Sequence, residues 1–282
     1  MIGFKKKKVK SKSRKRKQKL KRKYLRYGVF AVFCYLVFLI VTFPASIIAS
    51  FVKSNPQLNR QVQITAVDGT IWSGSAANVR VSSVNLGQLK WNLKVLPLLL
   101  AEAVLDIKFN DKTVTGLNTS GSGIVSVSLS GDLTVKNFTG AFSADSLAPL
   151  MYGMPARFGG DINLHIDEML LVQGQRINLK SRIVVSKARL ISPQKIDYGD
   201  ILIKATPKDS GTQLALTDQG GGPLILDGNV RLNGNGSYSV NLGLGARNSA
   251  SADLVNGLRF IGGRRDSAGK YRYRTNGKLR NW

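Results

Sequence analysis

The chain has 282 residues, with 42 lysine and arginine residues against 16 aspartate and glutamate residues and a formal net charge of +26. A single cysteine excludes an intramolecular disulfide, and with the single histidine it leaves too few ligands for a structural zinc site, which needs four. The length allows one or two domains with a sizeable core.

The positive charge is concentrated at the start of the chain. Fifteen basic residues lie between Lys5 and Arg26, and no acidic residue precedes Asp68. From Lys53 onward, 27 basic and 16 acidic residues give a net charge of +11 over 230 residues. The charge of the remaining chain is therefore only mildly positive, and nucleic-acid binding is a question for the tail alone.

Residues 1–27 form this basic tail, which has two interpretations. In the first, the tail sets membrane topology and binds anionic lipid headgroups, each Lys or Arg near the surface contributing on the order of 1 kcal/mol. In the second, it binds nucleic acid, but no aromatic side chain lies among its charges from Lys5 until Tyr24 to stack on bases. We favour anionic lipids as the partner and expect no specific nucleic acid.

An uncharged apolar segment follows between Arg26 and Lys53. About 20 apolar residues cross the hydrocarbon core of a bilayer, so residues 28–52 are long enough to span it. A cleaved signal peptide is the alternative, because small residues such as Ala45 suit cleavage, but its apolar region usually has about 7–15 residues. We predict an uncleaved signal anchor, in which Pro44 kinks the helix or marks its end.

The distribution of charge around this segment predicts its orientation. The fifteen basic residues precede it, whereas only Lys53 and Arg60 follow closely. Positive residues stay on the cytoplasmic side, so residues 53–282 would lie across the membrane, in the periplasm if the cell is a double-membrane bacterium. The absence of cysteine from residues 53–282 suits an oxidising compartment.

Beyond Leu58 the hydrophobic pattern has a period of two residues, typical of strands half-buried in an antiparallel sheet. Candidate strands recur about every ten to fifteen residues. They cover residues 61–64, 79–84, 88–95, 103–109, 124–129, 132–138, 162–166, 177–179, 182–188, 201–205, 213–216, 224–230, 240–244 and 271–274. Short helical patterns cover residues 97–102, 146–152 and 250–260. The sequence predicts a mostly β fold: a transmembrane helix followed by an antiparallel, curved, sheet-rich domain with a few short helices.

The search for catalytic residues centres on His165, the only histidine. General acid–base chemistry needs a partner at hydrogen-bond distance, and the local sequence shows none. Asp161 and Asp167 share the polar face of the predicted strand, but at about 3.3 Å per residue the set extends over about 20 Å, too far for one metal. No phosphate loop or nucleophile elbow is present, and the glycine-rich stretch 121–123 is expected in turns or bulges. We predict no enzyme activity, no metal and no cofactor.

Particular segments carry a resemblance to a known family. Residues 67–76 read V-D-G-T-I-W-S-G-S-A, and L-K-W-N-L and G-M-P-A-R-F-G-G follow at residues 89–93 and 153–160. With the glycine-containing end of the chain, these segments resemble the type II secretion system protein N family from about residue 28 onward; the long basic tail departs from that family in degree. The motif positions, to which we assign structural roles, are Gly69, Thr70, Trp72, Gly74, Trp91 and Pro155.

The resemblance implies an inner-membrane protein with a periplasmic β-rich domain that belongs to the machinery exporting folded proteins across the outer membrane. Its implied partners are other type II secretion components: the inner-membrane platform and, as a further candidate, the secretin. A looser resemblance to AsmA-like envelope proteins implies an alternative function, lipid handling or envelope maintenance, which requires an apolar groove along one sheet face. Trp72 and Trp91 are expected to pack in the core or on the sheet.

Overall fold

The structure is a computed structural model that describes residues 27–82, 84–111, 119–151, 156–172, 176–209, 211–262 and 265–278. The chain divides into two compact units between Pro44 and Ala45. The basic tail up to residue 26 and Pro155 lie outside the described residues.

The apolar segment is divided between two helices. Residues 27–41 are helical, and α2 (Ser46–Ser54) begins after Pro44. Proline lacks an N–H group and its ring clashes with the carbonyl one turn earlier, so a helix break here is one of the two outcomes predicted for Pro44. Among the described residues, no helix has both the length and the apolar character needed to cross a membrane.

Thirteen strands form one sheet in chain order, and each strand pairs antiparallel with the next. Their bounds are β1 (Val62–Gly69), β2 (Ser73–Val81), β3 (Val84–Lys94), β4 (Glu102–Asp111), β5 (Thr119–Ser128), β6 (Leu133–Ser143), β7 (Arg157–Val172), β8 (Arg176–Ser192), β9 (Ile196–Lys208), β10 (Gly211–Asp218), β11 (Leu224–Asn233), β12 (Ser237–Ala246) and β13 (Tyr271–Lys278). The short helices are α3 (Pro56–Gln61), α4 (Val95–Leu98), the 3-10 helix η1 (Ala144–Met151) and α5 (Ala252–Gly262). The predicted mostly β, antiparallel fold is confirmed.

The predicted strands differ from the observed ones at two places. The candidate 79–84 crosses a turn, because β2 ends at Val81 and β3 begins at Val84. The candidates 177–179 and 182–188 are parts of the single strand β8. Both errors have the same cause. Apolar–polar alternation indicates that the chain is extended, but it does not show where one strand ends and the next begins.

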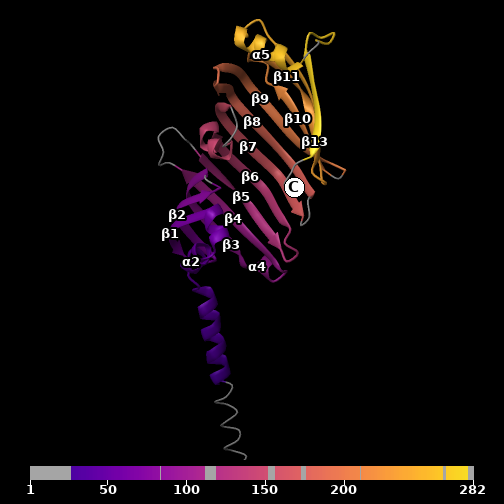
Figure 1. Cartoon of the computed structure of the whole chain (residues 1–282). Helices are drawn as coiled ribbons and strands as arrows, with labels where there is room; N and C mark the ends of the chain where they lie inside the picture. The colour runs from indigo at the N-terminus through magenta and orange to yellow at the C-terminus, as the bar shows by residue number, and fades with distance from the viewer. Residues whose placement is uncertain are drawn as a thin grey trace, which may run out of the picture. The chain divides into compact units, whose positions relative to one another are not determined.

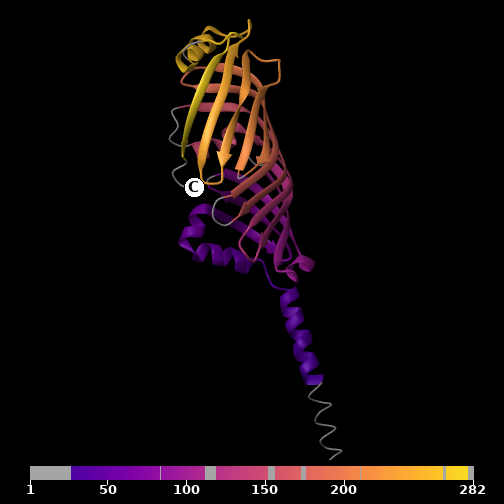
Figure 2. The same cartoon turned by 90° about the vertical axis from the view of Figure 1, so that its right-hand side faces the viewer.

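The sheet is curved. Figures 1 and 2 show the strands stacked one after another along the domain, with one face of the sheet concave. Adjacent strands twist relative to one another, so a long meander of strands curls unless a second layer flattens it.

A well-packed core occupies one end of the domain, where α5 covers the sheet (Figure 1). Leu254 and Leu258 of α5 are 3% and 4% exposed, and they pack with Leu224, Leu226 and Tyr271 of the last strands. A helix with an apolar stripe buries that stripe against a sheet in this way. The C-terminal end of the domain is therefore a two-layer structure.

An ion pair holds the same end together. The Arg247 guanidinium pairs with the Asp218 carboxylate, which also accepts the Leu226 N–H at 2.9 Å and the Gly220 N–H at 3.1 Å. Burial by itself would raise the pKa of Asp218, but these N–H groups and Arg247 together hold the pKa below its ordinary value. Asp218 therefore stabilises the fold above the unfolded pKa, near 4, and the stabilisation is lost as pH falls through the lower folded pKa.

Replacing Asp218 by asparagine should lower the free energy of unfolding at neutral pH by about 2 kcal/mol, because hydrogen bonds to a charged group are lost. The difference from the unmodified protein should shrink as the pH falls below about 4. Denaturant unfolding at neutral and acidic pH measures both effects. Asp197→Asn, at an exposed position on β9, is the control and should change stability by less than about 0.5 kcal/mol. Equal stabilities of Asp218→Asn and the control at neutral pH would contradict the assignment.

Candidate functional site

One face of the sheet is apolar along most of its length, because the strand register aligns apolar residues. Residues paired directly across antiparallel strands share a face. Leu164 pairs with Ile183, which pairs in turn with Ile203, so β7, β8 and β9 carry one apolar face. Their neighbours in sequence, such as His165 paired with Arg182, lie on the opposite, polar face.

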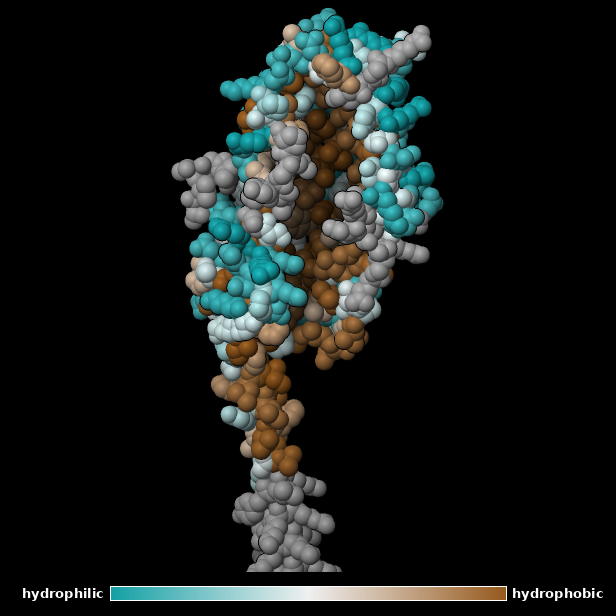
Figure 3. All heavy atoms as spheres, in the orientation of Figure 1, coloured by the Kyte–Doolittle hydropathy of each residue, from teal (hydrophilic) through white to brown (hydrophobic). Residues whose placement is uncertain are grey.

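The apolar face forms a groove. Figure 3 shows hydrophobic surface lining a hollow that runs along the domain between hydrophilic borders. The side chains of this face are half-buried over many strands; they include Trp91, Leu105, Phe138, Leu164, Ile183 and Val230. We call this surface the apolar groove. Contiguous apolar surface left open on this scale marks an interaction site.

Bulges keep the apolar residues on this face where the sequence alternation changes phase. Val135 and Phe138 are three residues apart, yet both face the groove because Asn137 adds a residue to β6 at φ 50°. Lys187, at φ 52°, does the same for Val185 and Ala188 in β8. An extra residue in one strand restores the face of the residues beyond it.

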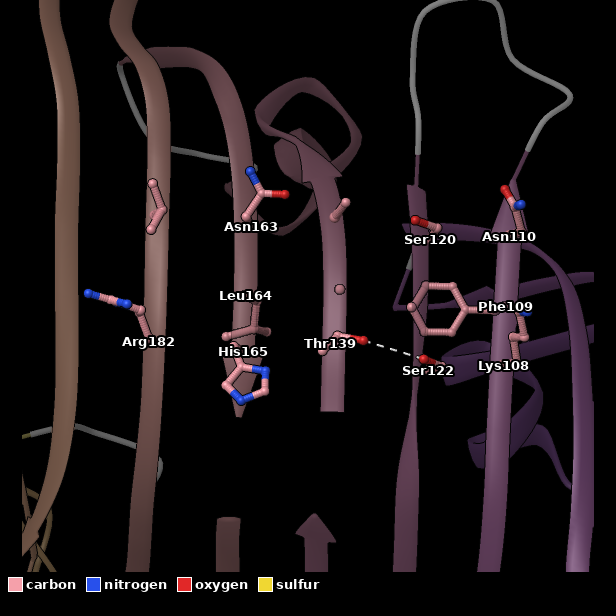
Figure 4. Close-up of a pocket in the computed structure, with 14 residues that line it drawn as sticks. Lys108, Phe109, Asn110, Ser120, Ser122, Thr139, Asn163, Leu164, His165 and Arg182 are labelled. Carbon is pink, nitrogen blue, oxygen red and sulfur yellow. Dashed lines mark hydrogen bonds between the residues drawn. The ribbon is translucent and has the colours of Figure 1, made fainter. Parts of the chain in front are cut away.

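A polar hollow of about 580 Å³ lies across the middle strands. Figure 4 shows its side chains arriving from neighbouring strands, with small hydroxyl groups between longer basic ones. Ser122 on β5 and Thr139 on β6 are 3.3 Å apart and hydrogen-bond each other. Lys108 and Arg182 lie on opposite sides of this floor, as Figure 4 shows. The hollow is therefore hydrogen-bonding and positively charged, in contrast to the groove.

His165 lies in the polar hollow, on the polar face where the sequence placed it. Its Nε2 is 3.0 Å from Asp167 Oδ1, so it has a carboxylate partner that the sequence did not reveal. Asp167 is also 3.8 Å from Lys180 Nζ, and all three side chains are about half exposed. Among the described residues, no group of three His, Cys, Asp or Glu side chains is placed to hold a metal ion. The arrangement is that of a solvated hydrogen bond and a solvated Lys180–Asp167 ion pair on a sheet surface.

The motif residues that the structure describes meet in the β1–β2 turn. Gly69 has φ 91°, and the Thr70 N–H donates to the carbonyl three residues later at 2.9 Å. The Trp72 carbonyl accepts a hydrogen bond of 2.6 Å from β3. Gly74 lies against the Trp91 ring, because a Cβ at position 74 would come within 2.4 Å of a ring carbon. These five residues fix a turn and its packing on β3; Pro155 lies outside the described residues.

The sequence analysis did not find several surfaces, because they form only when strands pair in a particular register. Gly121, expected in a turn or bulge, lies inside β5 against an aromatic ring of the groove: a Cβ at Gly121 would lie 2.5 Å from Phe109. Gly123 also lies in β5, but at the register shift between Ser122 and Ile124, which agrees with the predicted bulge. Ser122 and Arg182 were not singled out, although they line the polar hollow. The sequence does contain runs of small residues in two of these strands. Such runs indicate a shared surface only when the pairing of the strands is known.

The fold and these surfaces define a β protein built on one long antiparallel sheet, apolar on one face and polar on the other. The family model for type II secretion system (T2SS), protein N, matches residues 60–274, and the chain belongs to this family. Membership implies a role in type II secretion.

Two relatives agree with the family match. The chain is 28% identical over 263 residues to the type II secretion system protein N of Aeromonas hydrophila, covering 92% of this chain and 100% of the relative. It is 27% identical over 167 residues to the protein of the same name from Vibrio cholerae serotype O1, covering 59% of this chain and 64% of the relative. No solved structure matches the chain.

Replacing Gly69 by alanine should destabilise the domain by about 1–3 kcal/mol, because the backbone has φ 91° and the new Cβ would lie 2.6 Å from the Ser73 carbonyl oxygen. Gly220→Ala is the matched control, since Gly220 has φ 86° but nothing within 4 Å of the added Cβ. The control should show only the smaller conformational cost of about 1 kcal/mol. Denaturant unfolding followed by tryptophan fluorescence compares them. Equal losses in the two variants would refute a packing role for the turn.

Proposed function

We propose that this protein is a non-catalytic component of the type II secretion machinery that supports export of folded proteins across the outer membrane through periplasmic protein contacts. The observation that carries the proposal is the match to the protein N family over residues 60–274. The alignment covering the full length of the Aeromonas hydrophila relative supports it.

The proposal includes the location of the chain in the cell envelope. We divide the chain into a cytoplasmic basic tail (1–27), a signal anchor in the inner membrane (28–52) and a periplasmic domain (53–282). Support comes from the uncharged segment between Arg26 and Lys53 and from the fifteen basic residues before it. The tail would bind anionic lipids of the cytoplasmic leaflet.

The surfaces of the sheet suit contacts better than catalysis. The one carboxylate–histidine pair, His165 with Asp167, is solvated, and the Ser122 hydroxyl beside it in the polar hollow bonds to Thr139. In the part of the chain that the structure describes, β13 is the last strand of the sheet: it pairs along its length with β12, and its other side makes one isolated bridge, from Tyr271 to Arg265. A free edge can accept a strand from another protein. Platform subunits and the secretin are the proposed partners.

Deletion of the gene should reduce secretion of folded exoproteins and leave them in the periplasm. The full chain should restore secretion, whereas residues 1–52 alone should not, because the proposed contacts belong to the periplasmic domain. Enzyme assays of culture medium and periplasm, with immunoblots of the platform subunits, measure the outcome. Normal secretion together with normal platform subunit levels in the deletion strain would refute the proposal.

The apolar groove favours a second candidate function, lipid handling. A hollow of half-buried aliphatic and aromatic side chains offers acyl chains a dry environment, and its border is hydrophilic (Figure 3). Transfer of each methylene group from water to such a surface is favourable by about 0.8 kcal/mol. The groove supports the AsmA-like alternative, which requires an apolar groove along one sheet face.

If the groove handles lipid, Ile183→Asp should lose most crosslinking to a photoactivatable fatty acid. Arg182→Asp is the matched control: it changes the adjacent residue on the polar face and should retain crosslinking. Mass spectrometry of the crosslinked full-length chain locates the site. Equal crosslinking of the two variants, or none in the unmodified chain, would dismiss this second function.

A further inference from the structure

Leucines that are almost fully exposed gather at one end of the domain. In α4 and the turn after it, Leu96, Leu99 and Leu100 are 78%, 80% and 84% exposed, and Leu129 between β5 and β6 is 86% exposed. We call these four residues the leucine rim. Single exposed apolar residues are ordinary, but a cluster from two turns indicates a surface that another apolar phase covers.

The two turns are neighbours, and the rim continues into the groove. Glu102, at the start of β4, pairs with Ser128, which directly precedes Leu129. Val127 and Leu171, on the groove face of the strands that end here, are 39% and 38% exposed. Figure 3 shows hydrophobic surface extending from the hollow to this end of the domain. The groove is therefore open toward the rim.

The chain enters the domain at the same end. The N–H of Ala45, the first residue of the second unit, donates to the Gly69 carbonyl at 3.1 Å, in the β1–β2 turn. That turn is bound to the end of β3, because the Leu93 N–H donates to the Trp72 carbonyl at 2.6 Å. Helix α4 begins two residues later, at Val95. The apolar segment thus joins the domain close to the leucine rim.

We propose that the leucine rim inserts into the outer leaflet of the inner membrane and turns the groove opening toward the bilayer. The inference goes beyond secretion and rests on the proposed anchor (28–52), which contains Ala45, the residue hydrogen-bonded to Gly69 in the β1–β2 turn. A tether this short raises the effective concentration of lipid at the rim far above that of any diffusing partner. Leucines exposed on short turns enter the boundary between headgroups and acyl chains as the apolar face of an interfacial helix does.

The test uses the full chain in vesicles of phosphatidylethanolamine and phosphatidylglycerol. A nitroxide label on native Cys34 reports on the proposed anchor. In a Cys34→Ser background, labels are placed by Leu99→Cys and Leu129→Cys in the rim and by Phe260→Cys in α5. Phe260 is the matched control, since it is 93% exposed and apolar but lies on α5, at the far end of the domain in Figure 1. Relaxation by oxygen and by a water-soluble nickel complex gives the depth of each label.

We expect the labels at positions 99 and 129 to be relaxed more by oxygen than by nickel, and the label at 260 to show the reverse. Adding Leu96→Asp and Leu100→Asp should shift the label at 129 toward water without unfolding the domain, because both leucines are exposed. Nickel-dominated relaxation at both 99 and 129 overturns the proposal. The Cys34 label separates the two proposals. A Cys34 label in the bilayer together with hydrated labels at 99 and 129 contradicts insertion of the rim and leaves the anchor standing. A hydrated Cys34 label contradicts the anchor, and the labels at 99 and 129 still test insertion of the rim.

Discussion

The structure depends on cross-strand alignment of apolar residues over thirteen consecutive antiparallel strands. Each strand alternates apolar and polar side chains, and the pairing from Leu164 to Ile183 to Ile203 keeps one kind on one face. A shift of one residue in the register of any strand pair would place the apolar side chains of that strand on the face exposed to water. At two places the apolar–polar alternation shifts by one residue. There Asn137 and Lys187, at positive φ, are the extra residues of bulges that keep the apolar side chains beyond them on the same face. The bulges are therefore as necessary to the groove as the apolar residues are.

A single sheet with one apolar face needs a second layer, and among the described residues the buried core cluster lies where α5 supplies that layer. Helix α5 buries Leu254 and Leu258 against the last strands, while the groove side chains of the middle strands stay half-buried. On the other face, two basic side chains, Lys108 and Arg182, flank the polar hollow. The two faces thus offer different chemistry to a membrane and to protein partners.

The sequence analysis succeeded where the information was local. Alternation located the strands, and the V-D-G-T-I-W-S-G segment identified the family that the match over residues 60–274 confirms. It failed where chain reversal or register decided the outcome: residues 177–188 form one strand, and Gly121 lies within a strand against Phe109. The hydrogen bond between His165 and Asp167 was likewise missed, because two residues on the same face of a strand meet only if their side chains turn toward each other, which the sequence pattern does not show.

The sequence by itself determined the class of fold, the division of its charge and the family, because alternation, composition and motifs are properties of neighbouring residues. Only the tertiary structure decided that the apolar faces of successive strands join into one groove. It also decided that Leu99 and Leu129, thirty residues apart, share a rim. These features depend on which strands pair and in which register, and pairing is set by contacts between distant residues that no local pattern encodes.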